Sequence, residues 1–162
     1  MCMSYPEQVY TGEDGEINAR FRPASTPPDL GTAGQDAIHY LATMTTTRGE
    51  FGLYRVEMSA RSGGPRTHFH KTISESFFIL DGTVRLFDGA EWVDAQRGDF
   101  LHVPQGGLHA FRNDSDAPAE MLLLFTPGAP REAYFEGLAQ LAQATDEERA
   151  RFFDEHDSYF VE

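Results

Sequence analysis

The chain has little of several residue types, and each scarcity excludes a class of protein. Among its 162 residues there is one cysteine, Cys2, so neither a disulfide framework nor a cysteine-based metal cage can form within the chain. Cys2 stands in a segment that we expect to fray, which argues against a catalytic thiol. No apolar run approaches the ~20 residues that a membrane helix needs, and the first residues lack the basic-then-apolar pattern of a secretion signal. We therefore expect a cytoplasmic protein.

Basic residues are also scarce. Lys and Arg number 13 against 26 Asp and Glu, and the formal net charge is −13. Such a charge repels nucleic-acid phosphates and anionic lipids, so neither nucleic acid nor a membrane is an expected partner. Lys71 is the single lysine, and the other basic residues are arginines. This bias is typical of GC-rich bacterial genomes and predicts a bacterial origin.

The chain divides into three parts by composition. Residues 1–37 are rich in Pro, Gly, Asp and Thr and lack a helical period, which predicts an irregular N-terminal arm. Residues 38–128 consist of short apolar runs separated by turn signals, including Arg97-Gly98 and a predicted hairpin turn at Asp81-Gly82. Short strands without intervening helices predict an all-β sandwich or barrel.

Residues 129–162 change in character. Phe135, Leu138 and Leu141 are spaced by three residues, as on one face of an amphipathic helix. Thr145 stands three residues before Glu148, a capping-box spacing that predicts the start of a second helix. We expect both helices to pack on the outside of the β-domain or at a dimer contact.

Three histidines and a glutamate form the candidate metal site. His68 and His70 are two residues apart, so in a strand both imidazoles project from one face and can bind one metal ion. Glu75 lies an odd number of residues after His70, so a bend in the intervening segment is needed before it can share that face. His109, in a Gly- and Pro-rich context, adds a third nitrogen. Three nitrogens and one oxygen suit Fe, Mn, Ni, Co, Cu or Zn better than Ca or Mg.

These residues carry a resemblance to a known family. The first segment resembles the first motif of the cupin superfamily, a histidine-x-histidine pair followed by glutamate and, seven residues later, by glycine. The second segment resembles the second cupin motif, and fifteen residues separate the two, a compact gap typical of microbial cupins. One departure is Ser62, where the family motif begins with glycine. The matched positions are His68, His70, Glu75 and Gly82, then Gly98, Pro104, Gly106, His109 and Asn113.

The resemblance covers about residues 50–127 and implies both a fold and a metal site. It implies an all-β fold, a double-stranded antiparallel β-barrel of the jelly-roll type, with one divalent transition metal held near the barrel mouth. His68, His70, Glu75 and His109 carry over as its ligands. Homodimerisation is also implied.

The substrate pocket is predicted from strand alternation. Phe77 and Ile79 share parity with Glu75, and Phe111 shares parity with His109, so these side chains are expected to face the cavity. A further wall is expected from Phe51 and the alternate residues after it, or from their neighbours Tyr54 and Val56; the sequence leaves this parity open. An apolar, aromatic cavity suits a flat hydrophobic ligand better than a phosphorylated sugar, which requires convergent basic groups.

The resemblance implies a function of the quercetinase type. We expect a metal-dependent dioxygenase that uses dioxygen and a hydroxylated aromatic, flavonol-like or polyketide-like substrate. Glu75 is expected to act as general base, with its pKa raised by the apolar pocket. Two alternatives stay open: a zinc-dependent cupin that cyclises or isomerises polyketide-type metabolites, and a non-catalytic cupin that binds a small ligand. His39 and His156, outside the motifs, are expected to be exposed.

Overall fold

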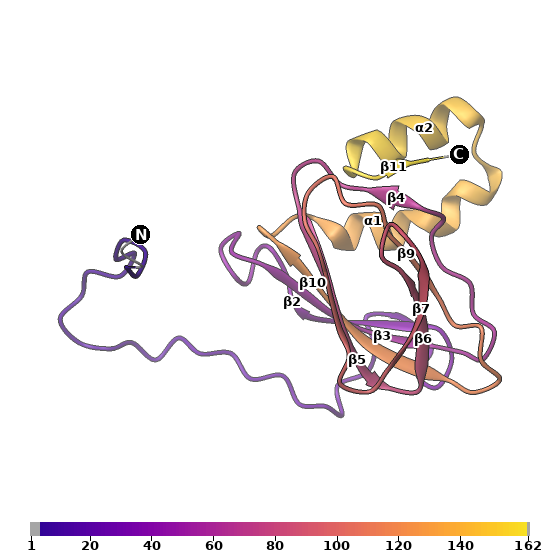
Figure 1. The fold of residues 1–162 in the computed structure, drawn as a ribbon. Helices are drawn as coiled ribbons and strands as arrows, with labels where there is room; N and C mark the ends of the chain where they lie inside the picture. Colours follow the sequence, from indigo (N-terminus) through magenta and orange to yellow (C-terminus); the bar gives the residue numbers. More distant parts are fainter. Residues whose placement is uncertain (1–3, 162) are drawn as a thin grey trace.

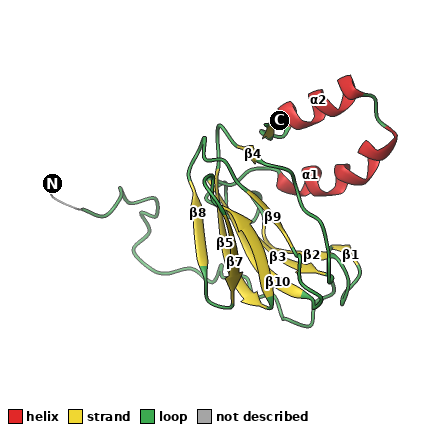
Figure 2. Cartoon of the chain, turned by 45° about the vertical axis from the view of Figure 1, so that its right-hand side comes forward, coloured by secondary structure: helices red, strands yellow, loops and turns green. Residues whose placement is uncertain are grey.

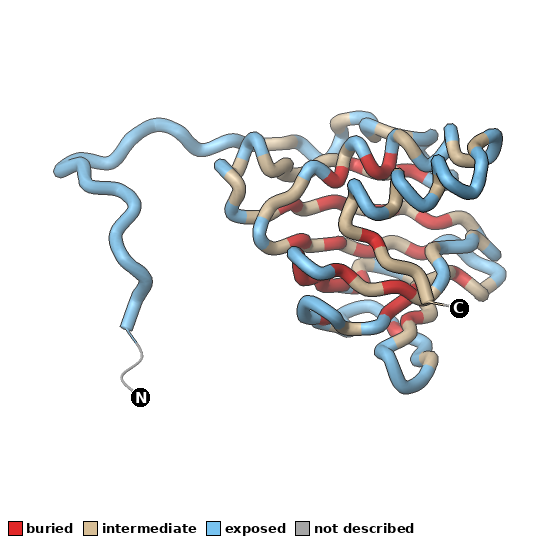
Figure 3. Tube along the Cα trace, turned by 90° about the horizontal axis from the view of Figure 1, so that it is seen from above, coloured by how far each residue is buried: buried red, intermediate tan, exposed pale blue. Residues whose placement is uncertain are grey.

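The computed structural model describes residues 4–161, and Cys2 lies outside them. Most of the described chain between residues 30 and 126 is short strand, and two helices and a 3-10 helix follow (Figure 1). Residues 4–21 are exposed throughout, and the arm extends away from the rest of the chain (Figures 1 and 3). The strands are β1 (Leu30–Gly31), β2 (Ala37–Ala42), β3 (Gly52–Met58), β4 (His68–Phe69), β5 (Ser74–Asp81), β6 (Thr83–Phe87), β7 (Trp92–Gln96), β8 (Phe100–Val103), β9 (Ala110–Arg112), β10 (Ala119–Thr126) and β11 (Tyr159–Phe160).

The strands form three antiparallel sheets (Figure 2). The largest has six strands in the order β1-β2-β3-β10-β5-β8, the second has the order β7-β6-β9, and β11 pairs with β4. Each sheet combines strands that are distant in the sequence, as in a jelly roll. The predicted all-β fold with two C-terminal helices is confirmed, although among the described strands the sheets are not hydrogen-bonded into a closed barrel.

The core lies between the two larger sheets and follows strand alternation. Along β10 the residues alternate strictly between buried and half-buried, because successive side chains point to opposite faces. Along β3 the buried positions include Tyr54 and Val56, whereas Leu53 and Arg55 are half-buried. Of the two alternatives that the sequence left open for this wall, the structure therefore has Tyr54 and Val56 facing inward. Figure 3 shows the buried stretches along the strands.

The turn at Asp81-Gly82 differs from the prediction. Strands β5 and β6 on either side of it do not pair with each other: β5 pairs with β10 and β8, and β6 pairs with β7 and β9. The hairpin prediction was wrong because the turn is a corner between two sheets. Gly82 has a φ of +69°, and a Cβ there would lie 2.5 Å from the carbonyl oxygen of Pro118. Glycine thus allows both the left-handed backbone and the close approach.

The C-terminal segment packs over one end of the sheets (Figure 1). It comprises α1 (Arg131–Gly137), a 3-10 helix (Leu138–Gln143) and α2 (Asp146–Glu155). The predicted capping box is confirmed, because Glu148 N donates to Thr145 Oγ1 and Thr145 N donates to Glu148 Oε2 at 2.8 Å. Helix α1 is held to the core by Phe135, whose ring centroid lies 5.1 Å from that of Tyr54. No helix within residues 4–161 is long and apolar enough to cross a membrane.

Candidate metal centre

His68 and His70 are positioned by the short strand β4 and the residue after it. The backbones of His68 and His109 form an antiparallel bridge, with His68 N donating to His109 O at 3.0 Å and His109 N donating to His68 O at 2.9 Å. On its other side β4 pairs with β11, in which Phe160 lies opposite His68. Two of the three histidines are therefore fixed to each other through the main chain.

Glu75 enters the same space from a different strand. It lies near the start of β5, opposite Val103 of β8 and Phe125 of β10, so its backbone is paired on both sides. A bend at residues 71–72 separates β4 from β5, as predicted from the odd spacing of His70 and Glu75. All four side chains are buried, and each offers a ligand atom within 4.8 Å of the others.

The ring orientation of each histidine is set by a backbone carbonyl. The Nδ1 atoms of His68 and His109 lie 2.8 Å from Arg66 O and 2.9 Å from Gly107 O, and that of His70 contacts the carbonyl of Asp157. A carbonyl oxygen only accepts, so Nδ1 carries a hydrogen; Nε2 then has the lone pair when the ring is neutral and a second hydrogen when the ring is protonated. This pattern is typical of metal-binding histidines, whose second nitrogen donates to a carbonyl or carboxylate.

The Nε2 atoms meet the carboxylate of Glu75. Oε2 lies 3.1 Å from His70 Nε2 and 2.8 Å from His109 Nε2. An ionised carboxylate and an imidazole nitrogen with a lone pair attract each other only through a shared proton or a shared cation. Three imidazole nitrogens and one carboxylate oxygen, buried and convergent, fit a divalent transition metal.

The pKa shifts of these groups have opposite directions. Burial lowers the pKa of His68 to about 4, so this imidazole is neutral near pH 7. Burial also opposes the charged form of His109, but the hydrogen bond and charge of Glu75 outweigh it and raise the pKa of His109. Burial alone would raise the pKa of Glu75, but hydrogen bonds from His109 and His70 lower it well below its usual range. The expectation of a raised pKa for Glu75 was wrong, because two histidines face the carboxylate.

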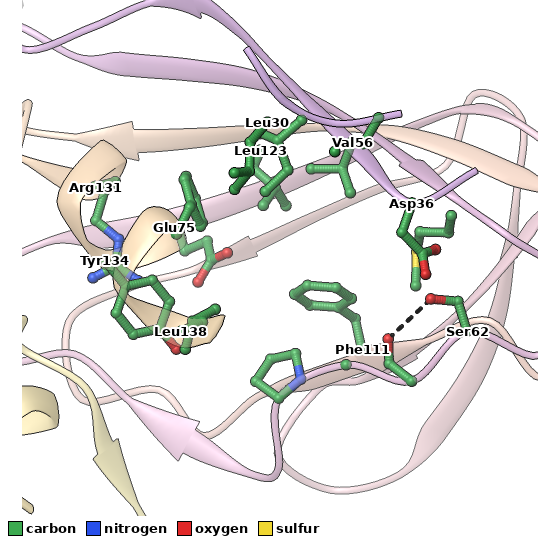
Figure 4. Close-up of a pocket in the computed structure, with 18 of the residues that line it drawn as sticks. Leu30, Asp36, Val56, Ser62, Glu75, Phe111, Leu123, Arg131, Tyr134 and Leu138 are labelled. Atoms are coloured by element: carbon green, nitrogen blue, oxygen red, sulfur yellow. Dashed lines mark hydrogen bonds between the residues drawn. The ribbon is translucent and has the colours of Figure 1, made fainter. Parts of the chain in front are cut away.

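A cavity of about 550 Å³ adjoins this cluster. His68 and Glu75 contribute to its wall, and most of the remaining lining is apolar, supplied by β3, β10, α1 and the C-terminal residues. Figure 4 shows Glu75 beside Arg131 and Tyr134 at one end, and Asp36 with Ser62 at the other. The volume lies within the range of pockets that bind small organic molecules.

The predicted pocket residues occupy different positions. Phe111 lines the cavity, whereas Phe51, Phe77 and Ile79 are not among its lining residues. Phe77 and Ile79 are fully buried in the core. Phe77 lies behind the cavity wall, with its ring centroid 5.7 Å from that of Phe111 and 5.9 Å from that of His109. It therefore supports the side chains that face the cavity.

Several residues that line the cavity were not predicted from the sequence, and they belong to the C-terminal segment. Their sequence signal was an arginine followed at helical spacing by aromatic residues, which the amphipathic pattern assigned to packing alone. They are Arg131, Tyr134, Phe135, Phe153 and Phe160.

The other histidines lie apart from the cluster. His102 is on β8, where its Nδ1 lies 2.8 Å from Ser76 Oγ. His39 is buried, not exposed as expected, because its Nε2 lies 2.6 Å from Glu57 Oε1 and 3.0 Å from Arg55 Nη2. His156, also expected to be exposed, is half-buried, with its ring centroid 4.5 Å from that of Phe152.

Comparison with known proteins agrees with this fold. Residues 54–125 match the family model described as "Cupin domain". Over 99 residues the chain is 29% identical to "Quercetin 2,3-dioxygenase" of Bacillus subtilis (strain 168). That match covers 57% of this chain and 27% of the relative, so the chain spans about a quarter of the relative's length.

Solved structures show the same fold at low sequence identity. Ectoine synthase from P. lautus superposes with a TM-score of 0.56 at 17% identity, covering 71% of this chain and 80% of that one. KdgF from Halomonas sp. superposes with a TM-score of 0.54 at 14% identity, covering 64% of this chain and 90% of that one.

Proposed function

Because this chain belongs to the cupin family through residues 54–125, we propose that it is a metal-dependent dioxygenase that acts on a flat, hydroxylated aromatic, flavonol-like or polyketide-like compound. The observation that carries the proposal is the buried cluster of His68, His70, Glu75 and His109 beside an apolar cavity. The partial match to a quercetin 2,3-dioxygenase supports the oxygenase reaction over others that cupins perform.

The four clustered side chains would hold one divalent transition metal, Fe, Mn, Ni, Co, Cu or Zn. When bound, the metal would supply Lewis acidity toward a substrate hydroxyl and, for a redox-active ion, the electron chemistry that dioxygen requires. The chain's contribution is geometry: three Nε2 atoms are aimed by backbone carbonyls, so little reorganisation is needed for binding.

Glu75 is the proposed general base. Its carboxylate is ionised near neutral pH, because His109 and His70 lower its pKa, and it faces the cavity. A carboxylate of low pKa is a weak base, so this role favours a substrate whose hydroxyl is already acidic, as in an enol or a flavonol. Glu75 would take that proton at a carboxylate oxygen.

The apolar walls would bind the body of the substrate and exclude water. Phe111, Phe125 and Phe135 approach the cavity from β9, β10 and α1, and they offer ring faces and edges to a planar ligand. Water exclusion strengthens the electrostatic interactions within the site and limits side reactions of the activated substrate.

Oxygen uptake with a panel of flavonols, measured on the full chain loaded with each metal in turn, tests the proposal. We expect substrate-dependent uptake that is lost in His109→Ala. Glu75→Gln should retain the metal and lose at least tenfold in kcat, since the amide cannot accept the proton. A Glu75→Gln variant with bound metal and unchanged turnover would remove Glu75 from the role of base.

The same experiment separates the alternative functions. Conversion of a substrate without oxygen by the zinc form would favour the cyclase or isomerase. Binding without conversion under any condition would favour the non-catalytic ligand-binding protein.

A further inference from the structure

Arg131 is a buried cation whose hydrogen bonds are incompletely satisfied in the described part of the chain. It is the first residue of α1 and is only 4% exposed. Its Nη1 donates to the backbone carbonyl of His156 at 2.7 Å, while its Nε is buried without any hydrogen-bond partner in the described part of the chain. None of the ion pairs within residues 4–161 includes Arg131.

The surroundings of Arg131 are aromatic. Its guanidinium carbon lies 4.0 Å from the ring centroid of Tyr134, 5.0 Å from that of Phe125 and 5.8 Å from that of Phe135. These contacts stabilise a cation in part, but Nε has no acceptor among the described residues. A buried donor without an acceptor is destabilising, and more so where it is charged. Such a group is therefore expected to have a partner in the functional state.

Arg131 lines the cavity at the end occupied by the metal cluster. Glu75 lies beside it (Figure 4), yet the carboxylate of Glu75 is directed to His70 and His109. An anion in the cavity could thus contact the guanidinium while the rest of the molecule rests against the apolar walls. A guanidinium presents parallel N–H groups that match two oxygens of a carboxylate or of an enol and its neighbouring carbonyl.

We propose that Arg131 determines substrate specificity by binding an anionic oxygen group, a carboxylate or an acidic enol, on a planar aromatic substrate whose body fills the cavity. This inference rests on the proposed function for the presence of a substrate, and it narrows the substrate class. Neutral flat compounds of the same size bind less tightly, because they leave the guanidinium unpaired.

The test compares two ligands of nearly equal shape, 2-naphthoate and 2-naphthamide, by calorimetric titration. The protein is the full chain loaded with zinc, which is redox-inert. We expect wild-type protein to bind the carboxylate at least tenfold more tightly than the amide. Arg131→Met should lose about 10- to 100-fold in affinity for 2-naphthoate and change little toward 2-naphthamide.

A matched control is Arg112→Met. The guanidinium of Arg112 also lies 4.0 Å from an aromatic centroid, that of Trp92, but it pairs with Asp114 and does not line the cavity. We expect this variant to keep the wild-type preference for the carboxylate. Arg131→Lys, which keeps a charge without the planar fork, should keep part of the preference.

Either of two results would overturn the inference: no preference for the carboxylate in the wild type, or an unchanged preference in folded Arg131→Met. If Arg131→Met does not fold, Arg131→Lys takes its place, and an unchanged preference in that variant would also contradict the inference. If neutral flavonols support oxygen uptake and Arg131→Met leaves the ligand preference unchanged, the inference is refuted and the dioxygenase proposal stands. An Arg131-dependent preference without oxygen uptake on any substrate would refute the dioxygenase and retain the inference.

Discussion

The Nδ1 atom of His70 donates to the backbone carbonyl of Asp157, a residue 87 positions later in the chain. The carboxylate of Asp157 reinforces this contact. It accepts from the backbone nitrogens of Lys71 at 2.8 Å and Thr72 at 2.9 Å, and from the Thr72 hydroxyl at 2.7 Å. Together with the pairing of β11 and β4, these bonds tie the C-terminal segment to two of the clustered histidines.

Replacing Asp157 should therefore weaken metal binding. Asp157→Ala removes three accepted hydrogen bonds and loosens the backbone that orients His70, so we expect about a tenfold loss of metal affinity. Asp157→Asn keeps one acceptor oxygen, so we expect its metal affinity to lie between those of Asp157→Ala and wild type. Competitive titration against a chromophoric chelator measures the affinity. Glu147→Ala, at an exposed position of α2, is the control. Equal affinities for Asp157→Ala and wild type would show that the segment does not position His70.

Two motif glycines should differ in their tolerance of alanine. Gly98 has a φ of +93° and an added Cβ would meet nothing within 4 Å, so Gly98→Ala should cost about 1 kcal/mol of unfolding free energy from backbone strain alone. Gly82 has the same kind of φ, and its added Cβ would also meet the Pro118 carbonyl. Gly82→Ala should therefore cost about 3 kcal/mol. Urea denaturation measures the free energy of unfolding of both variants. Equal decreases for Gly82→Ala and Gly98→Ala would mean that the close approach of the Pro118 carbonyl to Gly82 adds no cost.

Helix α1 should depend on Phe135 for its attachment. Phe135 is 9% exposed and contacts Tyr54, Phe125 and Tyr134. Phe135→Ala should lower the free energy of unfolding by about 3 kcal/mol, since it removes a buried ring and leaves a cavity. Phe21→Ala is the matched control, because that ring is 91% exposed in the arm, and we expect a change below about 0.5 kcal/mol. Similar effects of the two substitutions would mean that α1 is not anchored through Phe135.

The clustered residues were predictable because their signal is local. His68 in β4 and His70 just after it are two residues apart and share one face of the strand, and the Gly- and Pro-rich turns before His109 limit where that side chain can lie. The contacts made by Asp157 and Arg131 were not predictable in this way. The bond between Thr72 and Asp157 joins residues 85 positions apart, and the place of Arg131 in the cavity wall near Glu75 also depends on how the C-terminal segment crosses the sheets, which no spacing along the chain encodes.

Strand alternation predicted which residues are buried, but not which of them face a cavity. Phe77 and Ile79 point inward, as parity requires, yet they are core residues behind the cavity wall. His39 was misjudged for a related reason: its partners, Arg55 and Glu57, lie on the neighbouring strand β3, and pairing between β2 and β3 cannot be read from the sequence. The hairpin expected at Asp81-Gly82 failed because alternation does not specify strand partners.

The central claim is that His68, His70, Glu75 and His109 bind one transition metal. Elemental analysis of protein purified without chelators or a histidine tag tests it most directly, on wild type, His109→Ala and His102→Ala. His102 is the control because its side chain bonds to Ser76, away from the cluster. We predict about one equivalent of a divalent transition metal in wild type and His102→Ala, and loss of most of it in His109→Ala. Equal metal content in wild type and His109→Ala, or none in any of the three after reconstitution, would contradict the account.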